Sequence, residues 1–167
     1  MAATVEICES NGAGETITHS ITNTNMGNTD AVNLVAATYP ITPGNRSYIK
    51  YQRIHVTAMG GSASINNLQV WRTGALGGSC THVTNARTTS YAGALTYATP
   101  VTSAVSTVDQ TMPSADPAAA NLGIGGSLAG SITVAGYSDY LGHQLVTNGA
   151  DVAGSTSTMN FQYDETA

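Results

Sequence analysis

Hydrophobic and polar side chains alternate along much of this chain, with the two-residue period of a half-buried β-strand. In the clearest run, residues 47–57, Ile54 and Val56 alternate with Arg53 and His55. Such alternation places the aliphatic side chains on one face of a strand and the polar side chains on the other. No long stretch has the 3.6-residue period of an amphipathic helix. The pattern therefore predicts an all-β protein.

A second alternating run follows the first after a glycine-containing connection. Residues 65–72 alternate between aliphatic and polar side chains, and the connection at 58–64 contains two adjacent glycines. Two such runs joined by a short loop with glycine are typical of an antiparallel hairpin. We therefore predict that residues 47–57 pair with residues 65–72.

Shorter segments with the same period supply the remaining predicted strands. They are residues 16–22, 31–36, 101–112, 131–135, 139–147 and 156–163. In the last of them Met159, Phe161 and Tyr163 share one face, and the only helical turn that we expect is at 118–120. About eight or nine short strands separated by long polar loops predict an antiparallel β-sandwich of jelly-roll type. The length of 167 residues fits one domain over residues 1–167.

One glycine-rich polar segment, residues 74–90, has two interpretations. It is either an arm that orders against a neighbouring molecule or an exposed loop. Both are compatible with its composition, because neither requires a buried face.

The composition bears on the class of partner. Charged residues make up only 9% of the chain and the formal net charge is −5, whereas an average soluble domain has about 25% charged residues. Binding to nucleic acid by counterion release needs a basic surface, so we expect no nucleic acid as partner. The sequence has no run of about 18 apolar residues and no secretory signal at its start. We therefore expect no membrane partner.

The cysteines and histidines give no metal-binding motif. Cys8 and Cys80 form no C-x-x-C pair, and we expect both to be reduced. The four histidines are scattered singly, at His19, His55, His82 and His143. None of them has the short spacing that places two imidazoles on one metal ion. The sequence therefore predicts no metal site and no cofactor.

The serine-rich sequence also lacks a catalytic motif. A nucleophile elbow of the form G-x-S-x-G is absent. The ten acidic residues are scattered, with no aromatic cluster beside them to bind a sugar. We therefore expect no catalytic residues and no enzyme activity.

All five basic residues lie between positions 46 and 87, and all ten acidic residues lie outside that window. Within it, Arg53 and Arg72 lie on the two clearest strands, beside His55 and Trp71. Arginine and tryptophan are common anchors at protein interfaces. We therefore predict that these four residues form an interface that binds an acidic partner. The alternative is an ordinary solvated sheet face with arginine packed on aromatic rings.

Four runs carry a resemblance to a known class of proteins. They are YQRIHV at 51–56, LQVWRTG at 68–74, YSDYLGHQ at 137–144 and FQYDE at 161–165. In these runs the chain resembles small β-rich structural proteins of tailed-bacteriophage virions, namely capsid decoration (cement), collar and tail proteins. The resemblance implies a protein made in the cytoplasm of a host bacterium and located in the virion.

The same resemblance implies a mechanical function. A decoration protein binds the assembled icosahedral shell, commonly as a trimer, and stabilises it by bridging neighbouring capsomers. The implied partners are the major capsid protein or other virion proteins and further copies of the chain, as a homotrimer. A neck, collar or tail protein is the first alternative. The second alternative is a carbohydrate-binding jelly-roll module, in which the tyrosines would supply the aromatic rings that contact the sugar.

Overall fold

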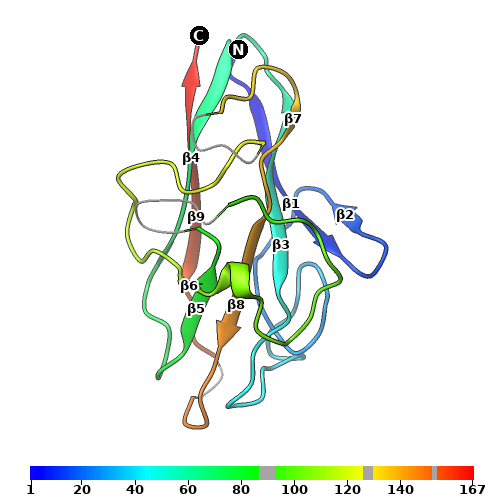
Figure 1. The fold of residues 1–167 in the computed structure, drawn as a ribbon, viewed down its shortest axis with the longest axis vertical. Coiled ribbons are helices and arrows are strands. Elements are labelled where there is room, and N and C mark those ends of the chain that lie inside the picture. The colour runs from blue at the N-terminus through cyan, green and yellow to red at the C-terminus, as the bar shows by residue number, and fades with distance from the viewer. Residues whose placement is uncertain (87–92, 126–129, 152–153) are drawn as a thin grey trace.

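The computed structural model describes residues 1–86, 93–125, 130–151 and 154–167, and almost all of its regular structure is β (Figure 1). The described strands are β1 (Thr4–Asn11), β2 (Thr16–Thr18), β3 (Lys50–Ala58), β4 (Ser64–Thr73), β5 (Thr81–Thr84), β6 (Gln110–Thr111), β7 (Gly136–Tyr137), β8 (Leu141–Val146) and β9 (Thr158–Thr166). The helical structure in this part of the chain is one 3-10 turn, η1 (Ser106–Val108). Within the described residues, no helix is long and apolar enough to cross a membrane. The predicted all-β class is confirmed.

The strands form two antiparallel sheets that pack as a sandwich. The large sheet has the order β2-β1-β3-β8-β5-β6, and β7 pairs with β3 beside this path. The small sheet consists of the long pair β4 and β9. The pair runs along one side of the molecule, with both chain termini near the same end (Figure 1). The finer prediction of a jelly roll is not confirmed, because the described strands divide seven to two between the sheets.

The main core lies between the two sheets. Ile54 and Val56 of β3 are fully buried there, together with Leu68 and Val70 of β4. The hydrophobic residues of β9 that pack against this core are Met159, Phe161 and Tyr163. Burial of each aliphatic side chain contributes about 1.5–3 kcal/mol relative to an exposed one. Since residues 159, 161 and 163 all pack against this core, the prediction that they share one face of a strand is confirmed.

The predicted hairpin between residues 47–57 and 65–72 is wrong. The two edges of β3 are taken by β1 on one side and by β8 and β7 on the other. β4 pairs instead with β9, so the connection at 59–63 passes from one sheet to the other. Alternation determines which side chains face the core, but both layers of a sandwich show it equally. It does not determine which strand edges form hydrogen bonds.

Several other predicted elements differ from the structure. Residues 31–36 form turns, residues 118–120 are not helical, and 101–112 contains only η1 and β6. Residues 131–135 contain one isolated bridge at Ile132. Buried residues of these segments, such as Leu34, Met112 and Ile132, pack into the interior from turns and loops and not from continuous strands. By contrast, β8 and β9 confirm the segments 139–147 and 156–163.

The glycine-rich segment 74–90 is only partly a loop. It contains β5, which pairs with β8 and β6 inside the large sheet and has three buried residues. The two interpretations as an arm or an exposed loop are therefore wrong for β5. Residues 87–90 of the segment lie outside the described residues. The four-residue strand is too short and too polar for its alternation to be recognised in the sequence.

A long segment, residues 93–109, crosses the outer face of the large sheet, which is the face turned away from β4 and β9 (Figure 1). Leu95 and Val108 from this segment pack against Ile49 and Tyr51 in a second, smaller core. The segment covers the part of the outer face around Tyr51. The part of the outer face around Arg53 lies beyond this second core. The candidate functional site is on that part of the face.

Gly142 of β8 lies under the crossing segment. A Cβ atom added there would overlap Leu95 Cδ2 and lie 2.8 Å from Val108 Cγ1. We expect Gly142→Ala to lower the free energy of unfolding by about 1–3 kcal/mol, because overpacking displaces side chains or backbone. The control is Gly149→Ala, whose added Cβ meets no atom within 4 Å and should change stability by less than about 0.5 kcal/mol. Equal denaturant midpoints for the two variants would show that residues 93–109 do not pack on β8.

Candidate functional site

The part of the outer face beyond the second core is built by alternate residues of adjacent strands. On β1 these are Glu6 and Cys8, and on β3 they are Arg53 and His55. Glu6 is directly opposite His55, Cys8 is opposite Arg53, and Tyr137 of β7 is opposite His55 on the other side. Directly opposite residues of antiparallel strands point to the same face. The five side chains therefore form one surface.

Arg53 is held among aromatic rings on this surface. Its guanidinium carbon lies 4.6 Å from the ring centre of Tyr137 and 4.3 Å from that of Tyr140. Its Nε donates a hydrogen bond to the carbonyl oxygen of Ser138 at 2.9 Å. The ring of His55 stacks on Tyr137, with 4.0 Å between ring centres and 7° between planes. The Arg53 side chain is therefore fixed in place by cation–π contacts and a hydrogen bond.

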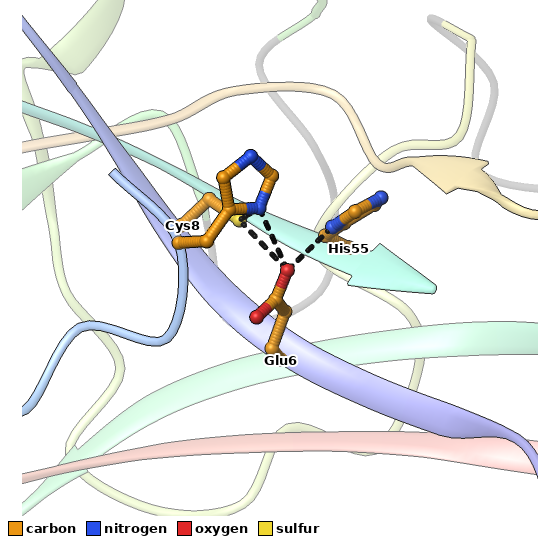
Figure 2. A group of neighbouring side chains, drawn as sticks. Glu6, Cys8 and His55 are labelled. Carbon is orange, nitrogen blue, oxygen red and sulfur yellow. Dashed lines mark hydrogen bonds and ion pairs between the residues drawn. The ribbon is translucent and has the colours of Figure 1, made fainter. Parts of the chain in front are cut away.

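Beside Arg53, two imidazoles and a thiol converge on one carboxylate oxygen. Oε1 of Glu6 lies 2.7 Å from Nδ1 of His19 and 2.7 Å from Nδ1 of His55. Sγ of Cys8 lies 3.7 Å from the same oxygen and 3.3 Å from His19 Nδ1. Figure 2 shows the Glu6 carboxylate pointing up between the Cys8 sulfur and the His55 ring. The other oxygen, Oε2, accepts a hydrogen bond from the hydroxyl of Ser20.

These contacts change the acidity of two groups. Hydrogen bonds from Ser20, His55 and His19 lower the pKa of the Glu6 carboxyl from 4.5 to about 2, so it is ionised at neutral pH. Burial, followed by the nearby Glu6 charge, raises the pKa of the Cys8 thiol to about 11. Cys8 is 1% exposed. With its pKa raised this far, the Cys8 thiol is protonated at neutral pH and a poor nucleophile.

The structure does not bring the four predicted interface residues together. Arg53 and His55 lie on the outer face of the large sheet, whereas Trp71 and Arg72 lie on β4 in the small sheet. Because Trp71 and Arg72 are consecutive in a strand, they point to opposite faces. The Arg72 guanidinium donates to the carbonyl oxygen of Gly74, and its buried Nε has no hydrogen-bond partner among the described residues. The predicted basic hairpin is thus two separate surfaces.

Comparisons with protein-family models, curated proteins and solved structures found no match to the chain. The function is therefore inferred from the residues themselves.

A second group of polar side chains is buried on the inner face of the large sheet. Lys50 Nζ donates to Glu9 Oε1 at 2.6 Å, and Gln52 Nε2 donates to Glu9 Oε2 at 3.0 Å. His143 Nε2 lies 3.1 Å from Gln52 Oε1, and His143 Nδ1 lies 2.9 Å from His82 Nε2. All five residues are at most 4% exposed. This row is closed to solvent, which makes it a structural network and not a reaction site.

Both cysteines are free, as expected, and they are in different parts of the molecule. Cys80 lines a cavity of about 490 Å³ together with apolar residues such as Ile41, Leu76 and Leu145. Burial, and then the charge of Asp151 in the same cavity, raise the pKa of the Cys80 thiol. Cys8 belongs to the cluster on the outer face. The two thiols therefore have separate environments, and no disulfide joins them.

One feature of the sequence indicates this cluster, although the spacing of the histidines and cysteines alone does not reveal it. In β1, Val5 and Ile7 alternate with Glu6 and Cys8, so a carboxylate and a thiol two residues apart share the polar face of a strand. We did not predict that strand. His19 joins the two through the pairing of β1 with β2, which no local spacing encodes.

Proposed function

We propose that the chain is a structural protein of a tailed-bacteriophage virion and acts as a capsid decoration protein, binding the assembled shell as a homotrimer. The observation that supports a binding role is the side chain of Arg53, held against Tyr137 and Tyr140 on the outer face of the large sheet. Arginine and tyrosine are enriched in the residues that contribute most to interface affinity. A preorganised arginine also loses less conformational entropy on binding.

The proposed contact is between Arg53 with its tyrosines and an acidic patch on the shell. A rigid β-sandwich with an open sheet face suits such a role, since each copy needs only one modest interface and many copies stabilise the particle together. The net charge of −5 supports a position on the outside of the shell, away from the packaged DNA. No catalysis is part of this proposal.

Two alternatives remain as proposals with less support. A neck, collar or tail protein would use the same surface at fewer positions. A carbohydrate-binding module would need an exposed aromatic ring on which a sugar stacks. The ring of Tyr137 is already in contact with His55 and Arg53, which leaves less of it for a sugar. The virion role therefore has the better support.

The test is retention on particles that lack the native protein. Arg53→Ala should remove a buried interface charge and release the protein at moderate salt, with a loss of about 2–5 kcal/mol of binding free energy. Arg72→Ala, which removes the same charge from the small sheet, should leave retention unchanged. Circular dichroism should show that both variants are folded. Full retention of Arg53→Ala together with release of Arg72→Ala would move the interface to the small sheet.

A further inference from the structure

Four metal-ligating side chains from neighbouring segments of the large sheet converge at one point. Glu6 and Cys8 share the outer face of β1, and His55 of β3 is opposite Glu6. His19 follows directly after β2, which pairs with β1. One ligand atom from each residue lies within 4.8 Å of the other three. Among the residues that the structure describes, no other group of three or more histidine, cysteine and acidic side chains is this close.

The distances are close to those of a tetrahedral zinc site. Zinc–ligand bonds of about 2.0–2.3 Å place neighbouring ligand atoms about 3.3–3.7 Å apart in a tetrahedron. Sγ of Cys8 is 3.3 Å from Nδ1 of His19 and 3.7 Å from Oε1 of Glu6. The two imidazole nitrogens are each 2.7 Å from that oxygen. The remaining pairs of ligand atoms lie within 4.8 Å of each other, so the main change that zinc requires is a movement of the Glu6 oxygen away from the two nitrogens.

The surroundings of the cluster orient its ligands. The Ser20 hydroxyl donates to Glu6 Oε2, which leaves Oε1 directed at the two imidazoles and the thiol. The ring of Tyr137 stacks on His55 and fixes the plane of that imidazole. Such partners around metal ligands hold them in the orientation that binding needs.

From this geometry we propose that Glu6, Cys8, His19 and His55 bind one zinc ion. The donor set is one thiolate, one carboxylate and two neutral imidazoles, whose two negative charges balance a divalent cation. Calcium and magnesium require mostly oxygen ligands, whereas zinc accepts sulfur, nitrogen and oxygen in a four-ligand site. On binding, the Cys8 thiol releases its proton to solvent, and the sulfur lone pair forms the bond to zinc.

The site is structural, because four protein ligands fill a tetrahedron and leave no position for a substrate. It ties β1 and β3 to the chain that leaves β2, the three-residue strand at the edge of the sheet. The proposal does not depend on a role in a virion.

The experiment uses the full chain, stripped with a chelator and titrated with zinc, and with cobalt(II) as a spectroscopic probe of the thiolate. The wild type should bind one zinc per chain, and cobalt should give a sulfur-to-metal charge-transfer band. Cys8→Ser should abolish that band. His19→Ala should weaken zinc binding by at least about tenfold, and since the His19 side chain is 48% exposed this variant should stay folded.

The matched control is Cys80→Ser, which removes the other thiol and should bind zinc and cobalt like the wild type. The proposal is overturned if the folded wild type binds no stoichiometric zinc, or if the cobalt band survives Cys8→Ser and disappears in Cys80→Ser. Stoichiometric copper(II) binding without zinc binding would overturn the assignment to zinc.

Discussion

Lys50→Met should lower the free energy of unfolding by about 3–5 kcal/mol, because it leaves a buried carboxylate without its cation. The Lys50 and Glu9 side chains are 5% and 0% exposed, and their charged atoms are 2.6 Å apart. Gln52 would still donate one hydrogen bond to Glu9, but a neutral donor does not compensate a buried charge. Urea denaturation of the two proteins at neutral pH measures the difference.

The control is the double variant Glu9→Gln with Lys50→Met, in which neither charge remains. It should recover a large part of the lost stability, since replacing both partners of a buried ion pair is far less costly than removing one. The single variant Glu9→Gln completes the comparison. If adding Glu9→Gln to Lys50→Met lowered the free energy of unfolding by as much as Glu9→Gln lowers it in the wild type, the two side chains would not interact.

The buried histidine pair should make the protein sensitive to mild acid. Burial lowers the pKa of His82 from 6.5 to about 3, with a smaller effect from the Arg72 charge. Burial, His82 and Lys50 lower the pKa of His143 well below 6.5. Below pH 6.5 the unfolded chain therefore takes up two protons that the folded chain does not. Stability is present above pH 6.5 and decreases as the pH falls, and His82 alone accounts for about 2 kcal/mol of the loss between pH 7 and 5.

The hydrogen bonds of the pair require neutral rings. If His143 donates from Nε2 to Gln52 Oε1, its Nδ1 can accept from His82 Nε2. His82 Nδ1, which has no partner among the described residues, is then an acceptor without a proton. Protonation of either ring would place two donors against each other or an unpaired charge in the interior.

His82→Gln isolates this effect, because it keeps a polar side chain of similar length and removes one titrating group. The loss of unfolding free energy between pH 7 and 5 should decrease by about 2 kcal/mol relative to the wild type. Denaturant unfolding at the two pH values gives the comparison. The Glu6 carboxyl does not contribute to this comparison, because its ordinary pKa of 4.5 already lies below the interval from pH 5 to 7. The same pH dependence in both proteins would contradict the assignment of His82 as a buried neutral ring.

The sequence predicted the fold class because alternation reports burial directly. Ile54 and Val56 of β3 and the apolar residues of β9 face the core as predicted. Pairing was not predictable in the same way. A strand of a sandwich shows the same pattern whichever neighbour it pairs with, so β3 and β4 were paired wrongly. β1 was missed because its inner face includes Glu9, a charge whose burial depends on Lys50 from another strand.

The candidate site was less predictable than the fold. Arg53 and His55 were predicted to lie on the polar face of one strand, and they do. Their contacts to Tyr137 depend on β7, a strand of two residues that has no recognisable pattern. The meeting of Glu6 with His19 depends on the register between β1 and β2. Local sequence contains the residue types of the cluster but not the strand order that brings them together.

The most direct test of the proposed function is the copy number of the chain in purified virions, measured by quantitative mass spectrometry against the major capsid protein. A decoration protein should be present in hundreds of copies per particle. A few to a few dozen copies would instead place it at the neck or tail. Absence of the chain from purified particles would contradict the virion role altogether.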